Sequence, residues 1–248
     1  MTARVALVTG AAGGIGAACV RALATAGYDV CINHFGTPEA AASVAQAMGT
    51  LGRRALVIDA DVGDAAAVAA MFAEIDRAFG RLDVLVNNAG IARSEDIFET
   101  SLDSWNDVLR TNLTGAFLCA RAAMLRMRTQ GSGRIIQMSS VVAHQGALKG
   151  HVHYGASKAG LIGLTKSLAR TAAPHGITVN AVAPGIVETD MLYATHGDAG
   201  IADLKARVPL NALATPDDIA AAVVYLASDA ARHITGAVLD INGGMLMR

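Results

Sequence analysis

The chain has 248 residues, of which 53% are hydrophobic and 17% are charged, and its formal net charge at pH 7 is -1. This balance gives no basic excess to attract nucleic acid or an anionic membrane, so we expect neither as a partner. No uncharged run approaches the roughly 18 residues that span a bilayer, and we expect no leader segment. Cys19, Cys31 and Cys119 lie far apart in apolar runs. Reduced core thiols of this kind suit the cytoplasm, where we expect the protein.

Apolar runs of strand length alternate with longer segments of helical period along the whole chain. Strands are predicted at residues 5–8, 30–32, 55–58, 84–86, 134–138, 178–182 and 238–241. Helices are predicted at residues 15–26, 39–51, 65–79, 102–127, 156–173 and 217–227. This order favours one α/β domain over residues 1–248, a doubly wound (Rossmann) parallel sheet of about seven strands with helices on both faces. The pattern thins at about 188–212, which we interpret as a substrate lid.

A glycine-rich loop joins the first strand to the first helix. Gly10 suits a tight turn, Gly14 lets the backbone approach a ligand, and Gly16 lets helix and strand pack closely. The free N–H groups at a helix start favour a phosphate there. We therefore expect a dinucleotide pyrophosphate on the loop residues Gly10, Gly13, Gly14, Ile15 and Gly16.

The spacing Thr-Gly-x-x-x-Gly-x-Gly resembles the short-chain dehydrogenase/reductase family, and further motifs follow in that family's order. They are Asp61-Val62, Asn87-Asn88-Ala89-Gly90, the segment from Pro184 to Thr189, and Asp240-Ile241-Asn242-Gly243-Gly244. The resemblance covers nearly the whole chain and implies a nicotinamide dinucleotide as cofactor. It places the cofactor against Asp61, Val62, Asn88, Ala89, Gly90, Pro184, Gly185, Val187 and Thr189.

The end of the second strand bears on the choice between NAD and NADP. An acid about 20 residues past the glycines usually holds the ribose 2′-hydroxyl of NAD. The chain reads Asn33-His34-Phe35-Gly36-Thr37 there, without an acid, but it also lacks an Arg or Lys for a 2′-phosphate. Asn33, His34 and Thr37 could donate hydrogen bonds to that phosphate. We therefore favour NADP and keep NAD as the alternative.

Tyr154 and Lys158 stand four residues apart and share one face of a helix. A phenol with its ordinary pKa near 10 is a sluggish acid or base at pH 7. A nearby ammonium and the oxidised nicotinamide would favour the phenolate and lower that pKa. The family's Tyr-x-x-x-Lys motif matches these positions. It implies that Tyr154 transfers the proton and that Lys158 also holds the nicotinamide ribose.

Two more residues follow from the resemblance. It places the hydroxyl that orients the substrate and stabilises an alkoxide at Ser140, with Ser139 as the competitor. It identifies Asn112 as a helix-bending residue that holds a water in a proton relay to Lys158. The alternative for Asn112 is a poor helix former that packing tolerates.

Histidines near Tyr154 invite a metal interpretation. His151 and His153 lack an evident third ligand of suitable spacing, and hydride transfer needs no metal. We expect no metal and interpret both as substrate-loop residues. The role of His144 stays open.

The predicted reaction passes hydride between the cofactor and a carbonyl or secondary alcohol. The tail 242–247 and the run Thr189-Asp190-Met191 resemble 3-oxoacyl-(acyl-carrier-protein) reductases, so we rank an acyl thioester first, bound to a carrier that Arg126 and Arg128 could meet. A sugar or polyol dehydrogenase of the same family is the nearest alternative. A nucleotide-sensing regulator without turnover is the alternative of another class.

The remaining expectations concern the lid and assembly. Met191, Leu192, Tyr193, Ile201 and Leu204 predict a partly apolar lid, with Lys205 and Arg207 as candidates to meet an anionic substrate. The resemblance implies a homotetramer built through the helices at 102–127 and 156–173. A dimer stays open.

Overall fold

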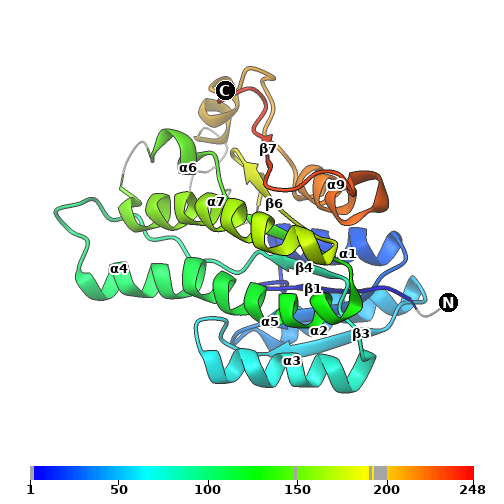
Figure 1. The fold of residues 1–248 in the computed structure, drawn as a ribbon. Coiled ribbons are helices and arrows are strands. Elements are labelled where there is room, and N and C mark those ends of the chain that lie inside the picture. The colour runs from blue at the N-terminus through cyan, green and yellow to red at the C-terminus, as the bar shows by residue number, and fades with distance from the viewer. Residues whose placement is uncertain (1–2, 148–149, 190–191, 193–199) are drawn as a thin grey trace.

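The computed structural model describes residues 3–147, 150–189, 192 and 200–248 (Figure 1). Its strands are β1 (Val5–Val8), β2 (Asp29–His34), β3 (Ala55–Asp59), β4 (Val84–Asn87), β5 (Gly133–Met138), β6 (Ile177–Pro184) and β7 (Val238–Ile241). Its longer helices are α1 (Gly14–Thr25), α2 (Pro38–Thr50), α3 (Ala65–Phe79), α4 (Leu102–Leu109), α5 (Gly115–Gln130), α7 (Val152–Ala172) and α9 (Pro216–Ala227). Shorter pieces are the π-helical turn η1 (Arg110–Thr114), α6 (Val142–Gln145), and the 3-10 turns η2 (Ala173–His175) and η3 (Asp229–Ala231).

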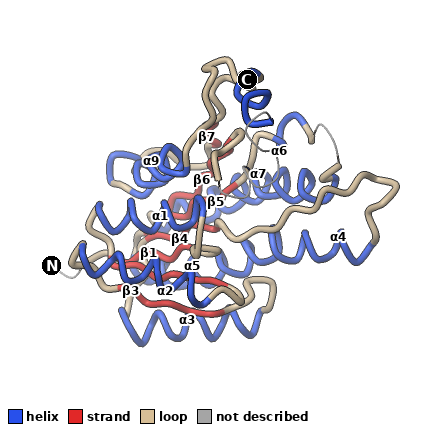
Figure 2. Tube along the Cα trace, turned by 180° about the vertical axis from the view of Figure 1, so that it is seen from behind, coloured by secondary structure: helices blue, strands red, loops and turns tan. Residues whose placement is uncertain are grey.

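The seven strands form one parallel sheet in the order β3-β2-β1-β4-β5-β6-β7. Figure 2 shows helices on both sides of these strands. The predicted doubly wound fold is therefore confirmed. The strand order reverses between β1 and β4, and ligands of such sheets bind at the carboxyl ends of the strands beside this switch point.

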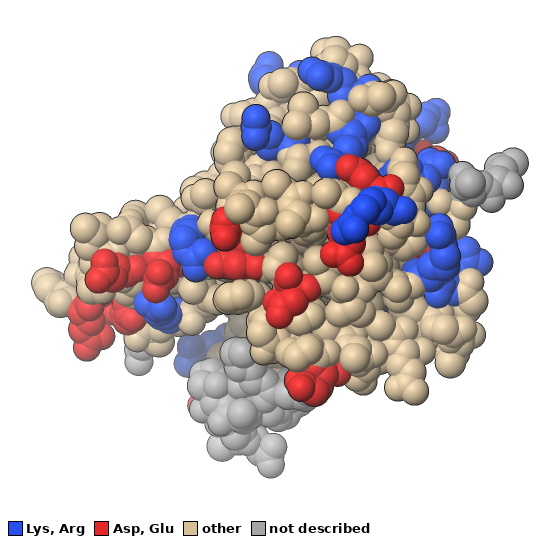
Figure 3. Space-filling model, turned by 90° about the horizontal axis from the view of Figure 1, so that it is seen from below, with Lys and Arg blue, Asp and Glu red and all other residues tan. Residues whose placement is uncertain are grey.

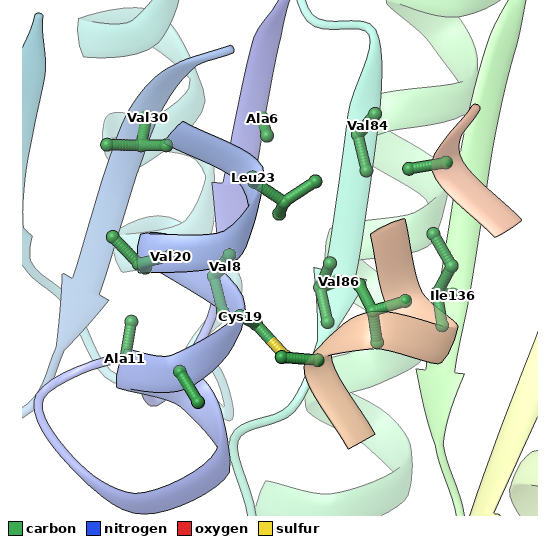
Figure 4. Close-up of a cluster of buried hydrophobic side chains, with 14 of the residues drawn as sticks. Ala6, Val8, Ala11, Cys19, Val20, Leu23, Val30, Val84, Val86 and Ile136 are labelled. Carbon is green, nitrogen blue, oxygen red and sulfur yellow. The ribbon is translucent and has the colours of Figure 1, made fainter. Parts of the chain in front are cut away.

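The five inner strands are buried on both faces, which is why they read as continuous apolar runs, whereas the edge strands β3 and β7 are partly exposed. On β1, Ala6 and Val8 pack on one face with residues of α1 and α9, a cluster that also contains Cys19 (Figure 4). Val5 and Leu7 point to the other face, among residues of α3, α5 and α7. The three cysteines are buried and free.

The helix predicted at residues 102–127 is not continuous, which corrects the sequence-based boundary. The structure has α4, the π-helical turn η1 and then α5. Asn112 lies inside η1, as a helix-bending residue should, and π turns of this kind frequently occur at functional sites. Helical periodicity persists through one wide turn, so the apolar pattern alone could not locate the break.

Part of the predicted lid, residues 190–191 and 193–199, lies outside the described residues. Met191 and Tyr193 are among them. Residues 200–206 are helical, and Ile201 and Val208 are buried in a small cluster with Leu213. Lys205 pairs with Glu188 at 3.0 Å.

The charged surface is mixed. Acidic side chains lie among basic ones on the face shown in Figure 3. In the part of the chain that the structure describes, no helix is long and apolar enough to cross a membrane.

Candidate active site

The glycine loop is held against the loop that follows β4. The Thr9 hydroxyl oxygen accepts hydrogen bonds from the backbone N–H groups of Asn88 and Ala89, both at 3.0 Å. The Asn88 amide donates in return to the carbonyl oxygens of Thr9 and Gly10. Gly10 adopts φ +61°, and a Cβ there would lie 2.8 Å from the Ala89 Cα atom. The two motifs thus form one rigid floor beneath the switch point.

The start of α1 has the features of a phosphate cradle. The helix has no side-chain cap at Gly13, so its first N–H groups stay available. A Cβ at Gly13 would meet nothing within 4 Å, and one at Gly14 would meet only Thr189, at 3.9 Å. A Cβ at Gly16 would lie 2.3 Å from the Gly10 carbonyl oxygen. Open space above Gly13 and Gly14, with tight packing beneath Gly16, fits a dinucleotide pyrophosphate.

Asp61 and Val62, the two residues expected to flank the adenine of the cofactor, follow β3. Asp61 is bound by the Arg110 guanidinium at 2.6 Å and accepts from the Gly63 N–H at 2.8 Å. Burial alone would raise the pKa of Asp61, but these hydrogen bonds hold it below its usual value. Val62 is buried, and a Cβ at Gly115 would lie 2.8 Å from its side chain.

The predicted nicotinamide segment leaves the end of β6. The Gly185 N–H donates to the carbonyl oxygen of Ile241, and Val187 forms a bridge with Ala214. These contacts fix the segment from Pro184 as it passes toward the glycine loop. Thr189 lies beside the glycine loop, because a Cβ added at Gly14 would be 3.9 Å from its side chain.

Asn33 and His34, two of the residues expected to meet a 2′-phosphate, are buried at the end of β2. Asn33 is 1% exposed, and its amide bonds within the fold, accepting from the Gly10 N–H at 3.3 Å and donating to the Ala60 oxygen at 3.0 Å. His34 is 4% exposed, and its Nδ1 accepts from the Thr37 N–H at 3.3 Å. Both side chains thus hold the tip of β2, and their expected donation to a 2′-phosphate stays a prediction.

Sequence reasoning also missed an acid at this tip. Asp59, the last residue of β3, pairs in register with His34, and its Oδ1 accepts from the Gly36 N–H at 3.3 Å. The acid is thus supplied by the neighbouring strand. The signal available in the sequence was the acidic end of the third predicted strand, which becomes meaningful only once β2 and β3 are known to be neighbours.

Tyr154, Lys158 and Ser140 converge at the carboxyl end of β5. The Lys158 Nζ atom lies 5.4 Å from the centroid of the Tyr154 ring and donates to the Met138 carbonyl oxygen at 2.7 Å. Burial raises the pKa of Tyr154, and a hydrogen bond with Ser140 opposes that rise. Burial also lowers the pKa of Lys158 to about 8. We expected the ammonium and the oxidised nicotinamide to lower the pKa of the phenol. In this structure burial raises that pKa and the Ser140 hydrogen bond opposes the rise, so the phenol keeps its proton at neutral pH.

The two adjacent serines have different partners. The Ser139 hydroxyl donates to the backbone oxygen of Lys158 at 2.9 Å, inside the protein. Ser140 is the serine that meets Tyr154. The geometry therefore favours Ser140, and gives Ser139 a structural role.

Asn112 joins three elements. Its Oδ1 accepts from the Ile91 N–H at 2.8 Å, and its Nδ2 donates to the Ile91 oxygen at 2.9 Å and to the Ser157 hydroxyl at 3.1 Å. A Cβ at Gly90 would lie 3.3 Å from Asn112 Oδ1 and 3.5 Å from Lys158 Nζ, so these residues meet at one point. The predicted water relay to Lys158 stays a prediction.

His144, His151 and His153 each have a different neighbouring side chain. His153 is fully buried, with Nε2 3.4 Å from a Glu95 carboxylate oxygen. His144 Nε2 lies 3.7 Å from Asp240. His151 adopts φ +58°, and its ring centroid lies 6.2 Å from that of Tyr154. Among the described residues, no group of three or more His, Cys, Asp or Glu could hold a metal ion.

Comparisons with known proteins identify the family. Residues 10–246 match the family model described as enoyl-(acyl carrier protein) reductase. The chain is 46% identical to the 3-oxoacyl-[acyl-carrier-protein] reductase FabG of Staphylococcus aureus, and 43% identical to that of Salmonella typhimurium, over 98% of each chain. A crystal structure of a putative short-chain alcohol dehydrogenase from Sinorhizobium meliloti superposes with TM-score 0.93 at 37% identity, covering 99% of this chain and 97% of that one. This chain belongs to the short-chain dehydrogenase/reductase family, and it is an NAD(P)-dependent oxidoreductase acting on CH–OH groups.

Proposed function

We propose that the protein reduces the 3-oxo group of an acyl thioester carried by an acyl carrier protein. The observation that carries the reaction type is the meeting of Ser140, Tyr154 and Lys158 at the carboxyl end of β5. The substrate class is supported by the relatives named above, which are 3-oxoacyl-[acyl-carrier-protein] reductases and align along nearly the full chain.

The proposed proton path starts at Tyr154. Because burial raises the pKa of this phenol, it is protonated at neutral pH and can give its proton to a carbonyl oxygen. Ser140 donates a hydrogen bond to the same oxygen and stabilises the developing alkoxide. Lys158 lies beside the phenol and would hold the ribose hydroxyls of the nicotinamide, and Asn112 would anchor a water that relays a proton to Lys158.

The cofactor is proposed to lie across the switch point. The glycine loop Gly10, Gly13, Gly14, Ile15 and Gly16 would hold its pyrophosphate, Asp61 and Val62 its adenine, and Asn88, Ala89 and Gly90 its central part. Pro184, Gly185, Val187 and Thr189 would hold the nicotinamide, which supplies or accepts the hydride when bound. The expectation of NADP assumed that no acid lies at the tip of β2, and Asp59 removes that premise.

A paired assay tests the substrate. Oxidation of NADH and NADPH is followed with acetoacetyl-CoA, and reduction of NAD and NADP is followed with a panel of sugars and polyols. Preference for acetoacetyl-CoA supports the proposal. Turnover confined to sugars or polyols would replace the substrate class while keeping the Tyr154 mechanism. Cofactor binding without turnover of any of these compounds would instead support the alternative function, a nucleotide-sensing regulator.

We also propose a homotetramer in the cytoplasm. An apolar hollow between α5 and α7 supports assembly through these helices; it is lined by Phe117, Met124, Leu125, Leu168 and Ile177 among others. Phe117 and Leu125 are 44% and 48% exposed and lie together in this hollow, and contiguous exposed apolar patches often mark protein–protein contacts. The buried free cysteines suit a reducing compartment. Light scattering separates a tetramer from a dimer.

A further inference from the structure

We propose that Asp59 selects the cofactor by holding the ribose 2′-hydroxyl of NAD and repelling the 2′-phosphate of NADP, a role that rests on the proposed cofactor use. In this fold an acid that follows β2 usually performs this task. Here β2 ends at His34, and the Asp59 carboxylate lies beside that end from the neighbouring strand β3.

The position of the Asp59 carboxylate is fixed by the tip of β2. Its Oδ1 accepts from the Gly36 N–H at 3.3 Å and lies 3.8 Å from His34 Nδ1. The side chain is 55% exposed, so the carboxylate faces solvent rather than the core. Its other oxygen, Oδ2, has no hydrogen-bond partner among the described residues, and it can accept a hydrogen from a hydroxyl.

The surroundings do not offset this negative charge. His34 Nδ1 accepts from the Thr37 N–H, so that nitrogen carries no hydrogen to give to a phosphate. Arg110 is bound by Asp61 at 2.6 Å. Arg54 precedes β3 and pairs with Asp29 at 2.7 Å, at the opposite end of the strand.

Because Arg110 and Arg54 are paired with other carboxylates in the part of the chain that the structure describes, a 2′-phosphate at this tip would meet the Asp59 carboxylate without either arginine to neutralise it. The neutral 2′-hydroxyl of NAD would instead donate to that carboxylate in a charge-assisted hydrogen bond. A 2′-phosphate carries about two negative charges, and their repulsion by one carboxylate about 5 Å away in water corresponds to a preference of about tenfold.

Direct binding measures this preference without turnover. Wild-type protein is titrated with NAD and with NADP, and we expect NAD to bind at least about tenfold more tightly. In Asp59→Asn the ratio of the two dissociation constants should narrow at least about fivefold, mainly through tighter NADP binding. Glu99→Gln, which removes one exposed negative charge elsewhere, should leave the ratio unchanged. Added salt should narrow the wild-type ratio but not that of Asp59→Asn.

The outcomes separate the two proposals. Tighter binding of NADP by the wild type, or an unchanged ratio in Asp59→Asn, would overturn the role of Asp59 and leave the oxidoreductase intact. Failure of both dinucleotides to bind folded wild-type protein would overturn the proposed function and this role together.

Discussion

The Ser139 hydroxyl donates a hydrogen bond to the backbone oxygen of Lys158, with 2.9 Å between the two atoms. This bond ties the segment that follows β5, which carries Ser140, to the first half of α7, which carries Tyr154. Ser139 thus stabilises the packing of these elements, while Ser140 forms a hydrogen bond with the Tyr154 phenol. Substitution of Ser139 should therefore mainly lower the free energy of unfolding, and substitution of Ser140 should mainly lower turnover.

Ser139→Ala should lower the free energy of unfolding by about 1 kcal/mol, the usual contribution of one intramolecular hydrogen bond. Its turnover should fall less than that of Ser140→Ala. We expect Ser140→Ala to fold as the wild type does and to lose roughly 100-fold in turnover, the scale of one oxyanion donor. Urea unfolding and steady-state kinetics measure the two effects. The reverse pattern would assign the substrate hydroxyl to Ser139.

Tyr154→Phe should reduce turnover by at least about 100-fold, because it removes the only proposed proton donor. The ring and its packing are retained, so circular dichroism and cofactor titration should match the wild type. Near-normal turnover in folded protein would remove Tyr154 from the mechanism.

Lys158→Met should stabilise the protein at pH 7. Burial lowers the pKa of Lys158 to about 8 in the folded protein, whereas the unfolded chain keeps the proton to about pH 10.4. Below pH 8 the folded state carries a buried ammonium, which costs stability. As pH rises from 8 toward 10.4, the unfolded chain binds more protons than the folded one, so wild-type stability from this residue rises.

The gain of Lys158→Met should therefore be largest at pH 7 and shrink toward pH 10, as measured by urea unfolding across that range. Lys166→Met is the matched control, because Lys166 lies on the exposed side of the same helix. The same gain from both variants, or none from Lys158→Met, would contradict the burial argument.

Gly13→Ala and Gly16→Ala should fail in different ways. The added methyl at Gly16 lies 2.3 Å from the Gly10 oxygen, so the variant should be destabilised by about 1–3 kcal/mol. The methyl at Gly13 meets nothing within 4 Å in the protein, and thermal stability should be unchanged. It would occupy the phosphate cradle, however, so dinucleotide affinity should fall. Normal affinity in Gly13→Ala would place the phosphate elsewhere.

Much of the fold could be predicted from the sequence because the period of apolar residues reports burial directly. All seven strands were found: five are buried on both faces, and the edge strands β3 and β7 still read as apolar runs although they are partly exposed. Periodicity could not show the break at Asn112, because a single π turn barely changes which residues face the core.

The site was predictable where one motif supplies all its parts, as with Tyr154 and Lys158 on one helix face. It was not predictable where two segments combine. Asp59 reaches the tip of β2 only through the pairing of β2 with β3, and the choice between Ser139 and Ser140 depends on which way each hydroxyl turns after the strand ends.

The contact between Thr9 and the Asn88 segment has a consequence for the growing polypeptide. β1 lies between β2 and β4, so one of its edges has no neighbour until residues 84–87 have been synthesised. A nascent chain shorter than this exposes a row of backbone groups that another strand can occupy. The contact between the glycine loop and the Asn88 segment forms when β4 covers this edge. The event that completes the dinucleotide site therefore also protects the chain from misassembly.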